Sequence, residues 1–300
     1  MPGRTLEQLI LHISNVVAPV VLCVLVGFAL AKFKLPYDNK MITMLVSNVG
    51  YPTLIIAHLS AGHVEFDAFL IMMAATVAAV ACFGVIAFAF LSVVGLSRRG
   101  FLSPLMLNNV GNIGFPICAL AFGAVGGAYA IAFLAVVLVG VFTIGMWLPM
   151  GKVTLGDLVR KPVIYAVIVA LVLMATDTRL PTPIDRTFTI LGGLAVPLLL
   201  LTLGHTLATL QTGALWRGCY LALFHLAMAG GVAFALVHLF GFTGVERGVF
   251  ILMCMMPPSV ATYLWVDMYD PDHAPDVAGF ILIATLLSVI VLPLVLAFWV

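Results

Sequence analysis

The sequence predicts an all-α membrane protein in which ten transmembrane helices form two five-helix repeats of opposite orientation. Three features predict this fold: an apolar composition, ten long apolar segments, and helix-breaking residues at corresponding places in the two halves. Hydrophobic residues make up 64% of the 300 residues, the mean hydropathy is +1.24, and 13 basic plus 12 acidic side chains give 25 charges. So few charges cannot cover a water-soluble surface.

Composition also narrows the class of protein. The net charge is +1 and no run of basic residues offers phosphate contacts, so a nucleic-acid partner is not expected. The five cysteines stand singly in apolar segments, a pattern typical of small buried hydrophobic residues rather than of disulfides or a metal site. No H-E-x-x-H or G-x-S-x-G motif occurs. We therefore expect no enzyme, cofactor or metal ion.

The apolar segments are long enough to cross a bilayer as helices. A hydrocarbon core of ~30 Å requires about 20 residues of α-helix. Ten segments are expected, at 13–32, 41–60, 68–94, 102–124, 127–149, 162–177, 186–208, 214–240, 246–266 and 278–299.

The basic residues predict the orientation of these segments, because loops rich in lysine and arginine stay in the cytoplasm. If the N-terminus lies outside, nine of the 13 basic residues face inward and four outward. The inward set is Lys32, Lys34, Lys40, Arg98, Arg99, Lys152, Arg160, Lys161 and Arg217, and the outward set is Arg4, Arg179, Arg186 and Arg247. Both termini are therefore expected outside.

Prolines indicate an internal repeat. Pro52 and Pro197 are 145 residues apart, Pro149 and Pro293 are 144 apart, and the same spacing carries Pro116 to within four residues of Pro258. Because five crossings are an odd number, the second copy must insert upside down. Residues 1–150 and 151–300 are thus expected to form an inverted pair of five-helix repeats.

Two segments are broken near their middles, at Gly111–Pro116 and at Met256–Ser259. Hydrocarbon offers no partner for free backbone groups, so non-helical backbone at membrane depth survives only inside protein or beside a cavity. Each break creates a half-helix with a positive end that attracts anions. Paired breaks in corresponding positions of two repeats indicate a transport site.

Four stretches carry a resemblance to a known family. They are 109–116 (NVGNIGFP), 194–204 (LAVPLLLLTLG), 256–263 (MPPSVATY) and 285–293 (TLLSVIVLP). In order and spacing they are similar to the auxin efflux carrier family of secondary transporters, in its prokaryotic permease form, and the likeness spans essentially the whole chain. This family resembles the larger group of bile acid, arsenite and riboflavin transporters.

The resemblance implies a carrier in which two broken helices cross, the fourth and the ninth. It implies a scaffold of spans 1, 2, 6 and 7 and a transport domain of spans 3–5 and 8–10, working by alternating access. Family substrates are small organic anions: auxin-like acids, malonate, malate and similar carboxylates. The family's asparagine falls at Asn109, whereas Asn112 stands where an apolar or aromatic residue is usual.

The candidate site residues follow from these breaks. Neutral amides can donate to a carboxylate without a fixed charge at membrane depth, or they can satisfy the carbonyls of the broken helices. Hydroxyls after the second break can bind substrate or return to backbone carbonyls. Asn48, one turn before Pro52, can line the opposite wall or pack the kink. The full set is Asn108, Asn109, Asn112, Gly114, Pro116, Pro257, Pro258, Ser259, Thr262, Tyr263 and Asn48.

No Asp, Glu, Lys or Arg lies near the centre of an expected span. Intramembrane charges mark many ion and proton pathways. A carrier of this sequence would need backbone carbonyls for sodium, a histidine for protons, or no coupling ion. The histidines concerned are His58, His205, His225 and His238.

Two alternatives remain open. An anion channel would show flux beyond carrier turnover in single-channel recordings. A membrane-embedded enzyme could use the acidic group Asp267, Asp270, Asp272 and Asp276 to hold magnesium and a diphosphate, although a second acidic cluster is missing. The expected partners are a small organic anion and the lipid bilayer of a bacterial inner membrane, and a homodimer is left open.

Overall fold

The computed structural model describes residues 6–60, 62, 64–152 and 161–298. Within these ranges the protein is entirely helical, with no strand and one isolated antiparallel bridge between Asn108 and Pro258. Arg4 and Arg160, which were counted in predicting the orientation, lie outside the described residues.

The helices follow one another as short and long pieces joined by tight connections. Their bounds are α1 Leu6–Lys32, α2 Asn39–Leu45, η1 Val46–Gly50, α3 Tyr51–Ser60, α4 Phe66–Val94, α5 Arg98–Met106, η2 Val110–Gly114, α6 Phe115–Phe142, α7 Ile144–Met150, α9 Pro162–Ala175, α10 Thr182–Gly193, α11 Ala195–Thr209, α12 Leu215–Phe240, α13 Gly244–Cys254, α14 Val260–Tyr269, η3 Pro271–His273 and α15 Ala274–Phe298. Elements η1 and η2 are π-helices, and η3 is a 3₁₀ turn.

Seven helical stretches of the described chain are long and apolar enough to cross a membrane, so the protein is an integral membrane protein. One of them, Val110–Met150, contains 41 residues and is interrupted at Gly123, whose φ of 66° lies in the left-handed region. Gly123 falls at the end of the expected segment 102–124, so this stretch contains parts of two expected segments. Helix occupies most of each of the ten expected ranges.

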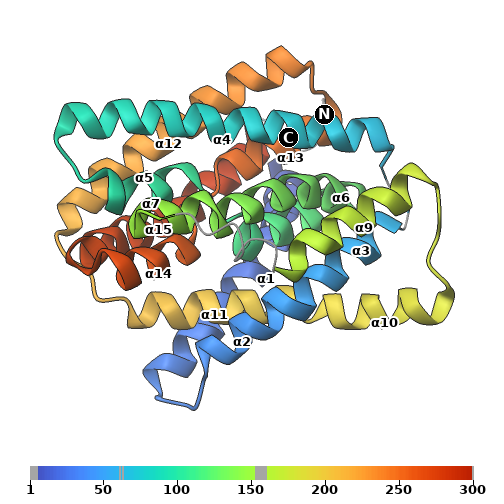
Figure 1. Cartoon of the computed structure of the whole chain (residues 1–300), viewed down its shortest axis with the longest axis horizontal. Coiled ribbons are helices and arrows are strands. Elements are labelled where there is room, and N and C mark those ends of the chain that lie inside the picture. Colours follow the sequence, from blue (N-terminus) through green and yellow to red (C-terminus); the bar gives the residue numbers. More distant parts are fainter. Residues whose placement is uncertain (1–5, 61, 63, 153–160, 299–300) are drawn as a thin grey trace.

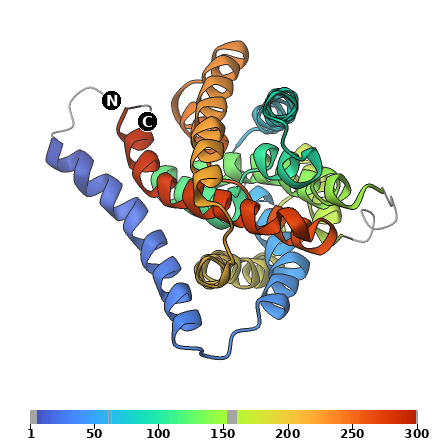
Figure 2. The same ribbon diagram turned by 90° about the vertical axis from the view of Figure 1, so that its left-hand side faces the viewer.

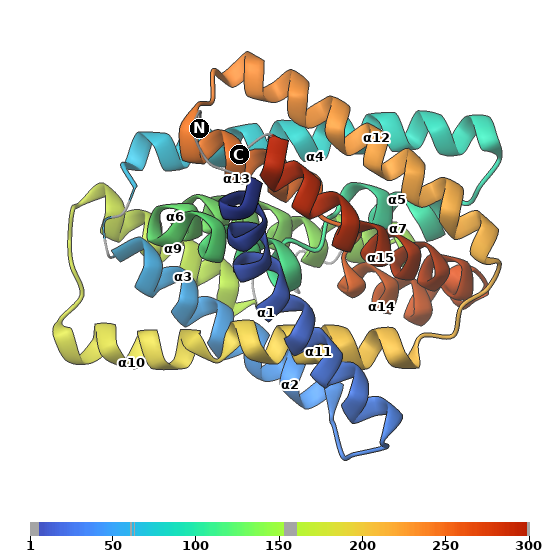
Figure 3. The ribbon, with the colours of Figure 1, turned by 180° about the vertical axis from the view of Figure 1, so that it is seen from behind.

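The helices pack in two groups. In one, α1 lies along α11, and α3 lies along α9 and α10; in the other, α12 lies along α15 and α4, and α6 lies along α13 and α4. Figure 1 shows α4 and α12 on one long side of the molecule and α2, α10 and α11 on the opposite side. Figure 2 shows α1, in dark blue, on an outer flank. Figure 3 shows α1 crossing in front of α11.

A pair of glycines brings α1 and α11 into backbone contact. A Cβ on Gly27 would collide with the carbonyl oxygen of Leu201, and a Cβ on Gly204 would collide with that of Val24. Small residues permit such close crossings, which stabilise helix pairs in membranes by van der Waals contact. Gly204 belongs to one of the four stretches that carry the family resemblance.

Each π-helix ends two residues before a proline. Pro52 follows η1 and Pro116 follows η2, in both cases at the second position of the next α-helix. Proline cannot donate to a preceding carbonyl and its ring crowds the preceding turn, and a wider turn accommodates both effects. The expected break at Gly111–Pro116 was therefore placed too late: the non-helical residues are 107–109, and the backbone of 110–116 is helical. The second break, at residues 255–259, agrees with the sequence prediction.

Candidate functional site

The two breaks lie against each other and are joined by backbone hydrogen bonds. The amide of Asn109 donates to the carbonyl oxygen of Pro257 at 2.7 Å, and the amide of Ser259 donates to that of Leu107 at 2.9 Å. These two bonds form the isolated bridge between the segments. Residues 148 to 152 positions apart therefore share one buried site, with Asn108 and Asn109 each only 3% exposed.

The Asn108 side chain is fully engaged in holding this site together. Its Nδ2 donates to the carbonyl oxygens of Cys254 at 2.6 Å and Met253 at 3.3 Å, which are the last carbonyls of α13. Its Oδ1 lies 3.1 Å from Nε2 of His225. A helix end otherwise leaves such carbonyls without partners. The Asn108 side chain therefore caps the C-terminal end of α13.

Asn109 differs from its neighbour. Its backbone carbonyl accepts from the amides of Ile113 and Gly114, both at 3.3 Å, and so begins the π-turn. Its side-chain Nδ2 is buried and has no hydrogen-bond partner among the described residues. A buried unpaired amide costs free energy comparable to a lost hydrogen bond. This nitrogen can therefore donate a hydrogen bond to a ligand.

The start of η2 adds backbone donors beside Asn109. Gly111 and Asn112 stand in the first turn of the helix, where an amide N–H has no intrahelical acceptor. The helix dipole makes this end positive. An unpaired side-chain donor next to a helix N-terminus favours an anion with oxygen acceptors.

Close packing shapes the same turn. A Cβ on Gly111 would collide with the hydroxyl oxygen of Tyr51, so this tyrosine from α3 presses on the start of η2. A Cβ on Gly114 would stand 2.6 Å from Sδ of Met253. Gly111 and Gly114 are both buried, and Pro116 follows at the second position of α6. These glycines let α3 and α13 approach the break.

The hydroxyls after the second break bond mainly to the backbone. Oγ of Ser259 accepts from the amide of Ala261 at 3.3 Å, and Oγ1 of Thr262 donates to the carbonyl of Ser259 at 2.6 Å. They cap and begin α14. Pro257 and Pro258 are buried beside Asn108, while Tyr263 is half-buried one residue beyond Thr262.

Asn48 and Asn112 occupy equivalent places in two similar turns. Residues 46–52 read VSNVGYP and residues 110–116 read VGNIGFP, with Val, Asn, Gly and Pro at the same positions. Both stretches form a π-helix before proline, and the Asn112 side chain is half-buried whereas Asn48 is exposed. This second internal likeness, at a spacing of 64 residues, could have identified Tyr51 as the counterpart of Phe115.

The histidines lie in different surroundings. His225 of α12 is 3% exposed and reaches the break through Asn108. His58 packs edge-on against Phe115 and lies within 3.2 Å of the Leu54 carbonyl. His205 stacks on Tyr37 and lies 3.1 Å from Nδ2 of Asn39, at the connection between α1 and α2.

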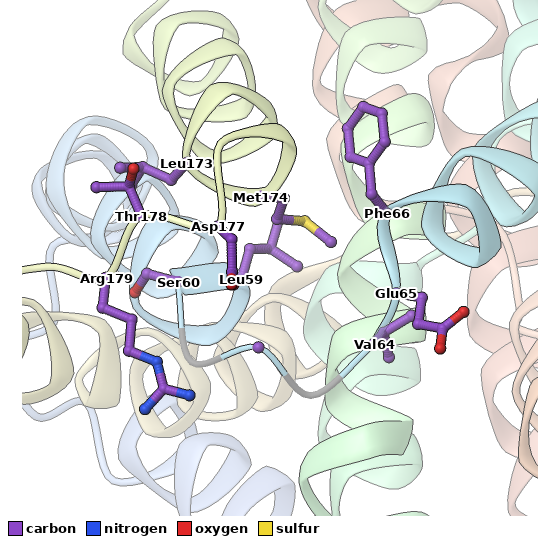
Figure 4. A pocket seen from close by; sticks show the side chains of 11 residues that line it. Leu59, Ser60, Val64, Glu65, Phe66, Leu173, Met174, Asp177, Thr178 and Arg179 are labelled. Atoms are coloured by element: carbon purple, nitrogen blue, oxygen red, sulfur yellow. The ribbon is translucent and has the colours of Figure 1, made fainter.

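A cavity of about 360 Å³ lies away from the breaks, at the ends of α3 and α9. Figure 4 shows Asp177 and Arg179, from the connection after α9, on one side and Glu65 with Phe66, at the start of α4, on the other. The cavity is thus lined by both packing groups of helices.

The acidic group after α14 is engaged in local contacts. Asp276 pairs with Arg217 at 2.6 Å, and Asp270 lies 3.0 Å from Nδ1 of His273. Within the described ranges, no three His, Cys, Asp or Glu side chains are placed to hold a metal ion.

Comparison with known proteins identifies the class of protein to which this chain belongs. A family model described as "Membrane transport protein" matches residues 145–296, about half of the chain. The chain belongs to this family of membrane transport proteins, and the resemblance to the auxin efflux carriers is confirmed. An uncharacterized transporter of Methanocaldococcus jannaschii is 28% identical over 207 residues. That alignment covers 65% of this chain and 66% of the relative, just under two thirds of the relative's length.

Proposed function

We propose that the protein is a secondary transporter that moves a small organic anion, a mono- or dicarboxylate such as malonate, malate or an auxin-like acid. The observation that carries this proposal is the buried Nδ2 of Asn109, which lies beside the first turn of η2 and has no hydrogen-bond partner among the residues that the structure describes. A carboxylate oxygen supplies the missing acceptor, and the positive helix end offsets the charge. No fixed charge is needed at membrane depth, which suits a site that must release its ligand.

The proposed mechanism is alternating access between two bodies. The scaffold contains α1 to α3 and α9 to α11, and the transport body contains α4 to α7 and α12 to α15, in agreement with the two packing groups. Both breaks belong to the transport body, so the site moves as a unit. The cavity shared by α3, α9 and α4 is the proposed outer vestibule along the seam.

The proposed topology is ten crossings in an inverted repeat, with both termini outside the inner membrane. In the ribbon views the start of α1 and the end of α15 lie near each other, which supports an even number of crossings. Segments that the proposed topology places on the inner face also contact one another in pairs, the start of α5 with the end of α7 and the α11–α12 connection with the start of α15. Arg99 donates to the carbonyl of Pro149 at 2.7 Å, and the amide of Gly213 donates to that of Pro275 at 2.8 Å.

The test is malonate binding to purified wild-type protein and to Asn109→Ala by titration calorimetry, after a thermal-shift screen of mono- and dicarboxylates. Losing one hydrogen bond to a charged group costs ~1.5–3 kcal/mol. We therefore expect affinity to fall roughly tenfold to hundredfold. Asn39→Ala, an amide change at the start of α2, is the matched control and should bind as wild type does. Gel filtration checks folding of each variant.

Two outcomes contradict the proposal at different levels. Wild-type affinity in folded Asn109→Ala would show that this amide does not bind the anion. Absence of any stabilising carboxylate in the screen of the wild-type protein would exclude the substrate class.

A further inference from the structure

We propose that His225 takes up one proton when the anion binds, so that transport is coupled to protons through this residue. The inference rests on the proposed function, because it concerns the same site. It begins from one contact: Nε2 of His225 lies 3.1 Å from Oδ1 of Asn108, the residue that joins the two breaks.

The tautomer of His225 follows from the Asn108 amide. The nitrogen Nδ2 must face the carbonyls of Cys254 and Met253, because a reversed amide would place its oxygen against two other oxygens. Oδ1 therefore faces Nε2 of His225 and can only accept. Nε2 thus carries hydrogen in both the neutral and the charged imidazole, and the atom that gains a proton is Nδ1.

Uptake of the proton leaves the hydrogen-bond chain intact. The bond from Nε2 to Asn108 becomes charge-assisted, and such bonds are shorter and stronger than neutral ones. Asn108 in turn holds the end of α13, whose carbonyls form the negative end of a helix dipole. The negative C-terminal end of α13 therefore favours a cation. The positive N-terminal end of η2, close by, favours the anion.

The surroundings make this charge depend on the ligand. His225 is 3% exposed, and its ring packs edge-on against Phe280, so burial opposes an isolated imidazolium. The helices packed around α12 are α4, α13 and α15. Their titratable and charged residues are Asp67 and Cys82 on α4, Glu246, Arg247 and Cys254 on α13, and Asp276 on α15, with Arg217, Cys219, Tyr220 and His238 on α12 itself.

The charged residues of these three neighbours lie in first turns at helix ends, and Asp276 is already paired with Arg217. The remaining groups nearer the break are thiols. A bound carboxylate therefore supplies the negative charge that stabilises an imidazolium of His225 at this depth. Proton and anion then favour each other's binding, and by linkage each raises the affinity for the other by the same factor.

The experiment measures protons taken up per malonate bound. Calorimetric titrations at pH 7.5 are run in two buffers of different ionisation enthalpy, with wild type, His225→Gln and His205→Gln. Glutamine at 225 can still donate to Asn108 but cannot titrate. We expect uptake of about one proton in wild type and in His205→Gln, and none in His225→Gln. Between pH 7 and 9 the wild-type affinity should fall as the pH rises, by up to about tenfold per pH unit while the bound histidine stays protonated, whereas that of His225→Gln should stay constant.

Each other result overturns the inference. Malonate binding without proton uptake in wild type would show an uncoupled site, while leaving the proposed function standing. Proton uptake that persists in His225→Gln would assign the proton to another group or to the ligand. If His225→Gln does not fold, the buffer comparison on wild type still decides whether a proton enters. Failure of wild type to bind any carboxylate would remove the proposed function and this inference together.

Discussion

The two helix breaks touch each other, yet they contribute unequal sets of hydrogen-bonding groups. The first break supplies two donors, the amide of Asn109 and the side chain of Asn108, and one acceptor, the carbonyl of Leu107. The second break and the end of α13 supply mainly acceptors, the carbonyls of Cys254 and Pro257. The amide of Ser259 is the donor that this side contributes, because Pro257 and Pro258 have no N–H to give. The prolines therefore create a local excess of acceptors that the asparagines of the first break balance.

The balance is uneven at the level of neighbouring residues. Asn108 uses its whole amide on protein groups, whereas Nδ2 of Asn109 has no partner in the described part of the chain. Under the proposed function, the two adjacent asparagines therefore have different roles, the first in stability and the second in anion binding. Changes at the first should act on the free energy of unfolding, and changes at the second on ligand affinity.

The largest effect is expected from Asn108→Ala. It removes three hydrogen bonds and leaves the carbonyls of Met253 and Cys254 buried without their side-chain donor. Each hydrogen bond contributes about 1 kcal/mol, or less where the unfolded chain in the membrane finds other partners. The free energy of unfolding should therefore fall by about 2–3 kcal/mol. Thermal unfolding in detergent measures it.

Asn109→Ala is the matched control for this comparison, because it deletes the same amide one residue later. It should leave the stability unchanged or raise it by up to about 1 kcal/mol, because the deleted donor has no partner among the described residues and its burial is unfavourable. Equal destabilisation by the two variants would contradict the division between them.

A smaller effect is expected from Gly111→Ala, which tests the contact of the first break with α3. The new methyl group would collide with the Tyr51 hydroxyl, and overpacking of this kind costs about 1–3 kcal/mol. Tyr51→Phe removes that oxygen, so the double variant should recover part of the lost stability. Melting temperatures of the two single variants and the double variant measure this coupling. Strict additivity would show that Tyr51 does not press on the turn.

The all-helical membrane architecture and the second break could be predicted from the sequence because hydropathy and the Pro257-Pro258 pair act locally. The position of the first break could not: Pro116 widens the turn before it into a π-helix, and the backbone leaves the helix only at 107–109. The roles of Asn108 and Asn109 also depended on a contact 145 residues away, with Met253 and Cys254. Sequence alone ranks both amides as candidates, and tertiary hydrogen bonds distinguish them.

A smaller loss of stability than for Asn108→Ala or Gly111→Ala is expected from Ser259→Ala, which tests whether the second break binds the anion. Oγ of Ser259 accepts from the amide of Ala261 and so acts as the N-cap of α14. Loss of such a cap costs ~1 kcal/mol, and we expect malonate affinity to remain unchanged because the hydroxyl is used as an acceptor by the helix. Thr262→Val is the companion variant, since it removes the hydroxyl that bonds to the Ser259 carbonyl and keeps the side-chain shape. A tenfold loss of affinity in either folded variant would mean that the hydroxyls turn toward the anion in the bound state, and the second break would then share the donor role assigned to the first.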